Sequence, residues 1–337
     1  MKNENIYELI QASYVTNILF ALTRQGVFDS LASEAKSLDT IANECGLKKE
    51  ILEDFLSTAV TLNFLKNNNR KYSNARKGFL LTEKVDSWFR AYLLLWGEQL
   101  NPTFSHLGFY LKTGENPFKV AHGEALWDFY EGNEQQGELF VDFMSKVTEQ
   151  SHIPAILREM DIGNAQTVVD VGGGKGAFIC AILNQNPHMA GVVFDQPSNA
   201  AKAMMNINSH GLGNACLFIG GNIFTQIPAD RDLYTIKHVL HDWDDDNVVE
   251  ILKSISTAMR QDSTLILIEG LMDRDFGSKH ENPEFLHTRN IEQKAWTAGK
   301  VRNSKEFEQL CSLANLEIQK VTHSSIFDIS YLYCKKP

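Results

Sequence analysis

The stretch that decides the fold is Val168-Val169-Asp170-Val171-Gly172-Gly173-Gly174-Lys175-Gly176, an apolar run that ends in a cluster of glycines. A short apolar run is typical of a buried strand, and glycines let the backbone adopt positive φ and pass close to a ligand. A strand, a glycine-rich turn and a helix start together predict a βα unit that binds a ligand at the strand end. A purely structural βα corner has the same outline, so this stretch alone leaves both interpretations open.

Short apolar runs alternate with helical stretches on either side of that turn. Besides 167–171, we predict strands at 191–195, 233–237 and 264–269. Strands that alternate with helices predict a doubly wound, Rossmann-like α/β fold with a mostly parallel sheet. The ligand of such a sheet is expected at the carboxyl ends of the strands.

The first part of the chain has a different pattern, in which helix follows helix. Apolar residues recur at three- and four-residue spacing between Ile6 and Leu22, which places them on one helix face. A helix–turn–helix outline at 37–63 is followed by a polar stretch at 67–74 that suits a small β-wing. We therefore expect an all-helical, winged-helix-like domain at 1–100, a helical linker at 101–160 that contributes to the substrate pocket, and a catalytic domain at 161–337.

A helix–turn–helix also suggests DNA binding through its second helix. That helix carries two lysines and three carboxylates, Lys48, Lys49, Glu50, Glu53 and Asp54, so it is poorly suited to phosphate contact. We favour packing or dimerisation for this segment over a regulator that binds nucleic acid.

Composition excludes several classes of function. The chain of 337 residues has a net charge of −10, which disfavours binding to nucleic acid or to an anionic membrane. Apolar runs long enough to span a membrane are absent from the sequence, and its start lacks the pattern of a signal peptide. Five scattered cysteines, and histidines at 106, 122 and 152 without ligand spacing, indicate neither a disulfide framework nor a metal site. We expect a cytoplasmic protein.

An acidic residue ends the second predicted strand. Asp195 lies 25 residues after Asp170, where a carboxylate can accept two hydrogen bonds from a ribose diol. A nicotinamide dinucleotide site has the glycine order G-x-G-x-x-G, and here Gly172, Gly174 and Ala177 occupy its three places. Because alanine is tolerated at the third place, spacing alone does not exclude NAD.

Together with a second motif, His241-Asp242-Trp243-Asp244-Asp245, the glycine stretch resembles the plant caffeate-type and bacterial small-molecule O-methyltransferases. Further matches along most of the chain are His122-Gly123 before Trp127, Phe140 with Met144, Gly221-Asn222-Ile223-Phe224, and Gly299-Lys300 with Arg302. The resemblance implies an enzyme of secondary metabolism that uses S-adenosylmethionine (SAM), releases S-adenosylhomocysteine, needs no metal and forms a homodimer through its N-terminal helices.

By the same resemblance the glycine turn holds the methionine part of SAM, Asp195 the ribose, and Asn222 with Ile223 the adenine. The full set of expected cofactor residues is Gly172, Gly174, Asp195, Gln196, Asn222, Ile223, Lys237 and Thr148. The family usually has Asp in place of Asn222, but an amide oxygen still accepts a hydrogen bond from the adenine amino group.

His241 is the expected general base. A phenol has a pKa near 10 and histidine one near 6.5, so a neutral imidazole can take the hydroxyl proton as the oxygen attacks the methyl group. The resemblance implies that Glu269, at the end of the next strand, orients His241 by holding one ring nitrogen as N–H.

The sequence departs from the family where a second orienting glutamate is common, because Val301 stands there. We therefore expect a His–Glu pair in place of a triad. Trp296 is bulky at a position where small polar residues are frequent, and Glu292, one helical turn earlier, offers a carboxylate from another direction.

Aromatic and thioether side chains suit a flat aromatic acceptor. The expected substrate residues are Phe140, Met144, Trp127, Trp296 and Glu292. The leading hypothesis is O-methylation of a phenolic small molecule. Val301 and Trp296 keep open a relative that retains SAM but catalyses hydroxylation, decarboxylation or a pericyclic step.

Overall fold

The computed structural model describes residues 4–273, 283–297, 299–325 and 328–337, which form two compact units. The N-terminal unit comprises Met1–Ser105 and Tyr130–Lys146, and the catalytic unit comprises His106–Phe129 and Val147–Pro337. Within the described residues, every helix is too short or too polar to cross a lipid bilayer.

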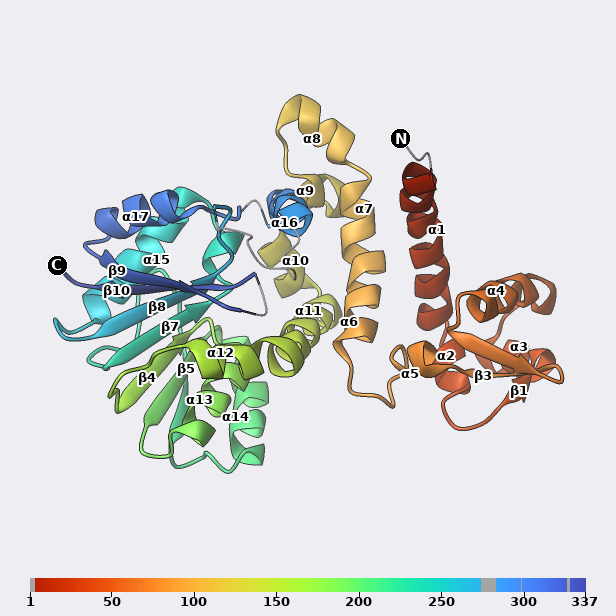
Figure 1. The fold of residues 1–337 in the computed structure, drawn as a ribbon, viewed down its shortest axis with the longest axis horizontal. Helices are drawn as coiled ribbons and strands as arrows, with labels where there is room; N and C mark the ends of the chain where they lie inside the picture. Colours follow the sequence, from red (N-terminus) through yellow and green to blue (C-terminus); the bar gives the residue numbers. More distant parts are fainter. Residues whose placement is uncertain (1–3, 274–282, 298, 326–327) are drawn as a thin grey trace. The chain divides into compact units, whose positions relative to one another are not determined.

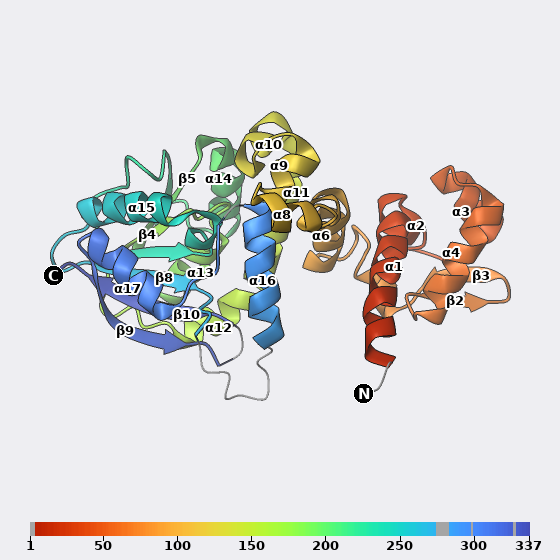
Figure 2. The same ribbon diagram turned by 90° about the horizontal axis from the view of Figure 1, so that it is seen from above.

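The N-terminal unit begins as a winged helix, as the sequence predicts. Its elements are α1 (Glu4–Arg24), α2 (Val27–Ser30), β1 (Lys36–Ser37), α3 (Leu38–Cys45), α4 (Lys49–Thr61), β2 (Leu65–Asn68) and β3 (Lys71–Asn74). Figure 2 shows the β2–β3 hairpin beside α4, and the sheet has the order β1-β3-β2. Asn69 and Arg70 both have positive φ at the tip of the hairpin, as a tight two-residue turn requires.

The rest of this unit consists of α5 (Arg76–Phe79), α6 (Trp88–Leu95), the π-helix η1 (Trp96–Leu100), α7 (Asn101–Phe104) and most of α11 (Glu134–Val147). Tyr92 on α6 stacks on Phe143 of α11, and the Gln99 amide donates to Gln136 at 2.8 Å. Because these contacts attach α11 to α6, the segment 101–160 divides between the two units. Our domain boundaries at 100 and 160 stay a prediction.

The catalytic unit contains a seven-stranded sheet in the order β6-β5-β4-β7-β8-β10-β9 (Figure 1). The strands are β4 (Thr167–Val171), β5 (Ala190–Asp195), β6 (Cys216–Gly220), β7 (Leu233–Lys237), β8 (Thr264–Glu269), β9 (Glu317–His323) and β10 (Ser330–Lys335). All neighbours pair in parallel except β10, which is antiparallel to both β8 and β9. The predicted doubly wound α/β fold is confirmed.

Helices cover both faces of this sheet. On one face α12 (Ile153–Glu159), α13 (Ala177–Gln185) and α14 (Ala200–Ser209) pack in a core that includes Val168, and on the other α15 (Asp245–Ala258) and α17 (Ser304–Leu313) pack in a core that includes Val169. Alternate residues of each buried strand therefore face different cores, which accounts for their continuous apolar runs. The remaining helices are α8 (Leu107–Thr113), α9 (Pro117–His122), α10 (Leu126–Gly132), η2 (Thr148–His152), η3 (Pro197–Asn199), η4 (Leu240–Asp242) and α16 (Pro283–Trp296).

The carboxyl ends of β4, β5, β7 and β8 meet at one edge of the sheet, because these strands run parallel. The glycine turn follows β4, and Asp195, Lys237 and Glu269 are the last residues of β5, β7 and β8. The fold thus brings the predicted cofactor and catalytic residues to the edge where such folds bind ligands.

Candidate active site

The turn after β4 depends on glycine. Gly172, Gly174 and Gly176 have φ of 71°, 56° and 77°, a region that disfavours other residues. A Cβ on Gly172 would lie 2.7 Å from a methyl carbon of Val239, so that position also needs close backbone approach. A Cβ on Gly174 would meet nothing within 4 Å. The backbone there borders open space, which fits a cofactor that lies against the turn.

Asp195 is tied to the glycine turn. Its Oδ2 accepts from the backbone N–H of Gly174 at 2.7 Å, and its Oδ1 accepts from the N–H of Gln196 at 2.7 Å and from Nδ2 of Asn199 at 2.8 Å. A carboxylate has about four acceptor positions, so room remains for a hydroxyl donor. Asp195 therefore stabilises the turn through its contact with Gly174. Its contact with the ribose stays a prediction.

Lys237 lies between Thr148 and Asp170. Its Nζ donates to the Thr148 hydroxyl at 3.0 Å, and Asp170 accepts from the Thr235 hydroxyl at 2.8 Å. Burial lowers the pKa of Lys237 to about 8 and raises the pKa of Asp170 to about 7. Thr148 begins the π-helix η2, a geometry that occurs often at functional sites. The structure thus brings Lys237 and Thr148 together.

The other predicted cofactor residues lie on the loops after β5 and β6. Gln196 is exposed, the Asn222 amide oxygen accepts from the N–H of Phe224 at 2.9 Å, and Ile223 packs against the core. Their contacts with SAM stay a prediction.

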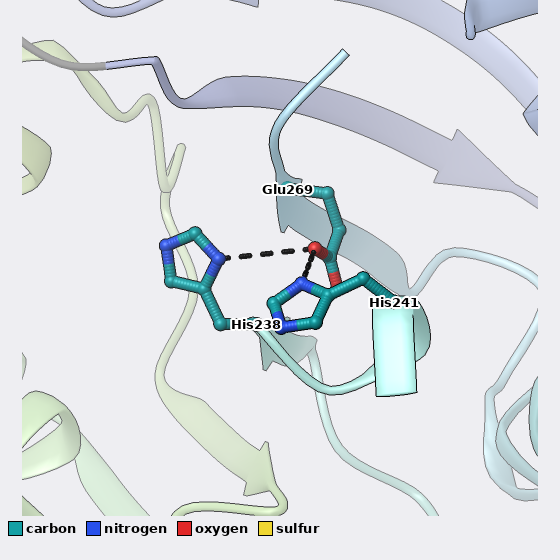
Figure 3. A group of neighbouring side chains, drawn as sticks. All are labelled: His238, His241 and Glu269. Carbon is teal, nitrogen blue, oxygen red and sulfur yellow. Dashed lines mark hydrogen bonds and ion pairs between the residues drawn. The ribbon is translucent and has the colours of Figure 1, made fainter. Parts of the chain in front are cut away.

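His241 and Glu269 form the pair that the sequence predicts (Figure 3). Nδ1 of His241 donates to Oε2 of Glu269 at 2.6 Å, while Oε1 of Glu269 accepts from the backbone N–H groups of Val239 and Leu240 at 3.1 and 2.9 Å. Both side chains are buried. Glu269 therefore fixes the imidazole and also the loop that carries it.

In this pair, the attraction between opposite charges shifts the pKa of each group more than burial does. Burial alone raises the pKa of Glu269, but the facing imidazoles of His241 and His238 hold it well below the usual range. For His241, burial lowers the pKa, but the carboxylates of Glu269 and Asp242 outweigh it, so the pKa of His241 is raised.

Sequence reasoning missed His238, which shares Glu269 with His241 (Figure 3). Its Nδ1 lies 3.8 Å from Oε2 of Glu269, and its ring centre lies 5.2 Å from that of His152. Burial lowers the pKa of His238 to about 4, so the ring is neutral at pH 7. Its positive φ of 52°, unusual outside glycine, gave no signal in the sequence.

Two histidines and a glutamate resemble a metal site in composition, and their candidate ligand atoms lie within 4.8 Å of one another. We interpret the group as a hydrogen-bonded one, because the short contact from His241 Nδ1 occupies Oε2 of Glu269. The expectation that the reaction needs no metal stays a prediction.

Gly299 and Arg302 hold the His241 loop from outside. The buried guanidinium of Arg302 donates to the carbonyls of Leu240 and Trp243 at 2.8 and 2.7 Å, on either side of His241. A Cβ on Gly299 would lie only 1.9 Å from the carbonyl oxygen of His241. The sequence marked these two residues as family matches but did not reveal that they contact the loop that carries His241.

Helix α16 supplies a further contact that sequence reasoning missed. Gln293 is buried, and one orientation of its amide satisfies all its neighbours. Its oxygen then accepts from Nε2 of His241 at 3.2 Å and from Arg289 at 3.1 Å, and its nitrogen donates to Asp242 at 3.2 Å. Glu292, which we considered as a carboxylate near His241, is paired with Arg289 instead, at 3.1 Å.

The predicted substrate residues are distributed over both units. Trp127 stacks on Trp243 with ring centres 6.0 Å apart, and Trp296 is buried at the end of α16. Phe140 and Met144 lie on α11 in the N-terminal unit, where Phe140 stacks on Tyr130. The contribution of these residues and of Glu292 to an acceptor site stays a prediction.

Two family models match this chain. Residues 104–316, more than half of the chain, match the O-methyltransferase domain, and residues 7–84 match the O-methyltransferase dimerisation domain. The second match covers the winged helix and agrees with packing or dimerisation in place of DNA binding.

Individual relatives agree with these matches. The mitomycin biosynthesis 6-O-methyltransferase of Streptomyces lavendulae is 31% identical over 280 residues, which cover 80% of this chain and 78% of that one. The phenazine O-methyltransferase PhzM of Lysobacter antibioticus is 25% identical over 318 residues, 94% of this chain and 91% of that one. The solved structure of the mitomycin 7-O-methyltransferase MmcR has a TM-score of 0.90 at 25% identity, covering 99% of this chain and 97% of that one. The chain therefore belongs to the O-methyltransferase family and is an S-adenosylmethionine-dependent O-methyltransferase.

Proposed function

We propose that this enzyme methylates a phenolic hydroxyl of an aromatic small molecule, with His241 as the general base and Glu269 as its orienting partner. The observation that carries the proposal is the buried His241–Glu269 pair at the carboxyl edge of the sheet. It is supported by relatives that are named for methylation of aromatic secondary metabolites, among them mitomycin and phenazine enzymes.

The chain's own residues prepare the acceptor oxygen. Glu269 keeps a proton on Nδ1 of His241, so Nε2, in the state in which it carries no proton, is the nitrogen that takes the proton of a neutral phenol. Arg302 and Gly299 hold the loop so that Nε2 stays in place. The glycine turn, Asp195 and Lys237 would hold SAM, which would supply an electrophilic methyl group on a positively charged sulfur. Alignment of the reacting groups by these residues accounts for much of the remaining rate.

Incubation with SAM and a panel of polyphenols and hydroxylated polyketides, followed by mass spectrometry, tests the proposal. We expect a product heavier by one methylene unit, together with S-adenosylhomocysteine. Tight SAM binding without any methylated product would contradict the proposal and favour the relative that retains SAM for another reaction. Methylation of nitrogen in an amino-substituted acceptor would contradict only the choice of oxygen.

We also propose that the enzyme is a homodimer formed through its N-terminal unit. One face of α1 exposes apolar side chains, namely Ile6, Tyr7, Leu9, Ile10 and Tyr14, and the helix lies in the segment that matches the dimerisation domain. Light scattering on the full chain is expected to show a dimer, and Leu9→Glu to weaken it. Leu111→Glu on α8, a leucine that is even more exposed than Leu9, is the matched control. A stable monomer at micromolar concentration would contradict the proposal.

A cytoplasmic setting is part of the same proposal. It is supported by five cysteines that are all free thiols, four of them buried. The expectation that the enzyme binds neither nucleic acid nor membranes rests on its net charge of −10 and stays a prediction.

A further inference from the structure

Gln293 faces the ring nitrogen of His241 that the proposed reaction uses. Its side chain is 1% exposed and reaches His241 and Asp242 from α16. We propose that Gln293 is a positioning residue that holds His241 in its doubly protonated form before the acceptor binds, and that the site consequently favours phenols that arrive already ionised. The second part of this inference rests on the function proposed above.

The orientation of the Gln293 amide is determined by neighbours with fixed roles. The Arg289 guanidinium can only donate, and the Asp242 carboxylate, when ionised, can only accept. The amide oxygen therefore faces Arg289, at 3.1 Å, and the amide nitrogen faces Asp242, at 3.2 Å. In this orientation the oxygen also lies 3.2 Å from Nε2 of His241. Because an amide oxygen can only accept, a hydrogen bond across this contact requires a proton on Nε2, and the contact therefore favours the protonated nitrogen.

The other ring nitrogen is protonated as well. Nδ1 donates to Glu269 at 2.6 Å, so hydrogen-bond acceptors lie at both ends of the imidazole. Oδ1 of Asp242 adds a second negative charge 3.6 Å from Nε2. Hydrogen bonds to the charged form of a group favour that form, so these contacts stabilise the imidazolium relative to the neutral ring.

Charged and titratable groups from each neighbouring element act on His241. Glu269 from β8 and Asp242 from η4 favour the imidazolium, whereas Arg289 from α16 opposes it. His238 is neutral at pH 7; Lys237 lowers the pKa of His238, and both groups lower the pKa of His152. The balance raises the pKa of His241 despite its burial, in agreement with the hydrogen-bond geometry.

This protonation state has a consequence for the acceptor. Between them, the acceptor oxygen and Nε2 hold one proton when the oxygen is ready to react. A phenolate can replace the Gln293 oxygen as the partner of the Nε2 proton, and no proton leaves the site. A neutral phenol brings a second proton, so one proton must first pass to solvent. Acidic phenols, such as those with electron-withdrawing ring substituents, are therefore the favoured class.

Histidine titration by NMR tests the inference on the full-length enzyme without an acceptor. The ring carbon signals of 13C-labelled histidine report protonation, and the missing signal in His241→Gln assigns the residue. We expect His241 to titrate above pH 6.5 in the unsubstituted enzyme. Gln293→Met removes the amide acceptor at similar size, so the midpoint should fall by about one unit. Gln293→Glu supplies a charged acceptor, so the midpoint should rise.

Opposite shifts from two substitutions at one position distinguish this role from a merely structural one. Gln309→Met, the same change at an exposed position on α17, should leave the midpoint unchanged. Equal midpoints in the unsubstituted enzyme and Gln293→Met would overturn the inference, whether or not methylation is observed. If the midpoints shift as expected but no phenol is methylated, the proposed function fails while the role of Gln293 stands.

Discussion

The glycine turn after β4 and the His241 loop after β7 leave neighbouring strands at the same edge of the sheet, but different forces hold them. The turn is shaped by local backbone geometry, with three glycines at positive φ and one brace from Asp195. The His241 loop is held by side chains that lie 28 to 61 residues further along the chain, namely Glu269, Gln293 and Arg302.

Because of this difference, we expect SAM affinity and the rate of methyl transfer to respond to different substitutions. A substitution at Gly174 or Asp195, away from the contact between Gly172 and Val239, should change cofactor affinity and leave His241 in place. A substitution in any of the segments that hold His241 should slow the reaction and leave cofactor affinity nearly unchanged. The predictions below test that separation.

The largest effect is expected from removal of the base. With a neutral phenol as the acceptor, His241→Ala should reduce turnover by roughly 10²–10⁴-fold, the usual contribution of a positioned general base. SAM affinity, measured by calorimetry, should be nearly unchanged, because the glycine turn does not depend on this side chain. His210→Ala, an exposed histidine after α14, serves as the control. Full methylation by His241→Ala would show that another residue is the base, or that the acceptor needs none.

Gly299→Ala should also disturb the His241 loop, from a segment further along the chain. Because the added Cβ would lie 1.9 Å from the carbonyl oxygen of His241, the loop must shift. We expect the free energy of unfolding to fall by about 1–3 kcal/mol, the usual effect of overpacking, and turnover to fall with it.

Denaturant unfolding and steady-state kinetics check this prediction. The control is Gly108→Ala on α8, where a Cβ would meet nothing within 4 Å. If Gly299→Ala weakened SAM binding as much as it slowed turnover, cofactor binding by the glycine turn would not be independent of the His241 loop.

Asp195→Ala tests the glycine turn and its predicted role in cofactor binding. It removes the brace of the glycine turn and the expected ribose acceptor, so SAM affinity should fall by about 1–3 kcal/mol in calorimetry. Turnover at saturating SAM should change little. Asp262→Ala, an exposed carboxylate just before β8 at the opposite edge of the sheet, is the control. Unchanged affinity would place the ribose elsewhere.

The same contrast explains what could be predicted from the sequence. The four strands at 167–171, 191–195, 233–237 and 264–269 were predicted within one residue, because buried parallel strands are continuous apolar runs. The strands β6, β9 and β10 were not predicted. β9 lies at the sheet edge and is polar on most positions, so it lacks that pattern.

In the site, the pair of His241 and Glu269 was predicted from the family resemblance, and the parallel strands that end at one edge account for their meeting. The role of Gln293 could not be predicted, because it depends on where α16 packs, and the pattern of apolar residues in a helix does not give its position in the fold. Glu292, the preceding residue of that helix, points about 100° away and pairs with Arg289, and its contribution to an acceptor site stays a prediction.

The smallest effect is a shift of pH dependence that compares two acceptors. The pKa of His241 is raised, so below it the ring keeps its Nε2 proton. For a neutral phenol, kcat/KM should therefore fall as the pH drops through this raised pKa. For a nitro-substituted phenol that is ionised over the same range, kcat/KM should stay level until the acceptor itself is protonated. In Gln293→Met the decline for the neutral phenol should move about one unit lower, which raises kcat/KM up to roughly tenfold on the acid side. If kcat/KM depended on pH in the same way for the two acceptors, the protonation state of His241 would not control the methyl-transfer reaction.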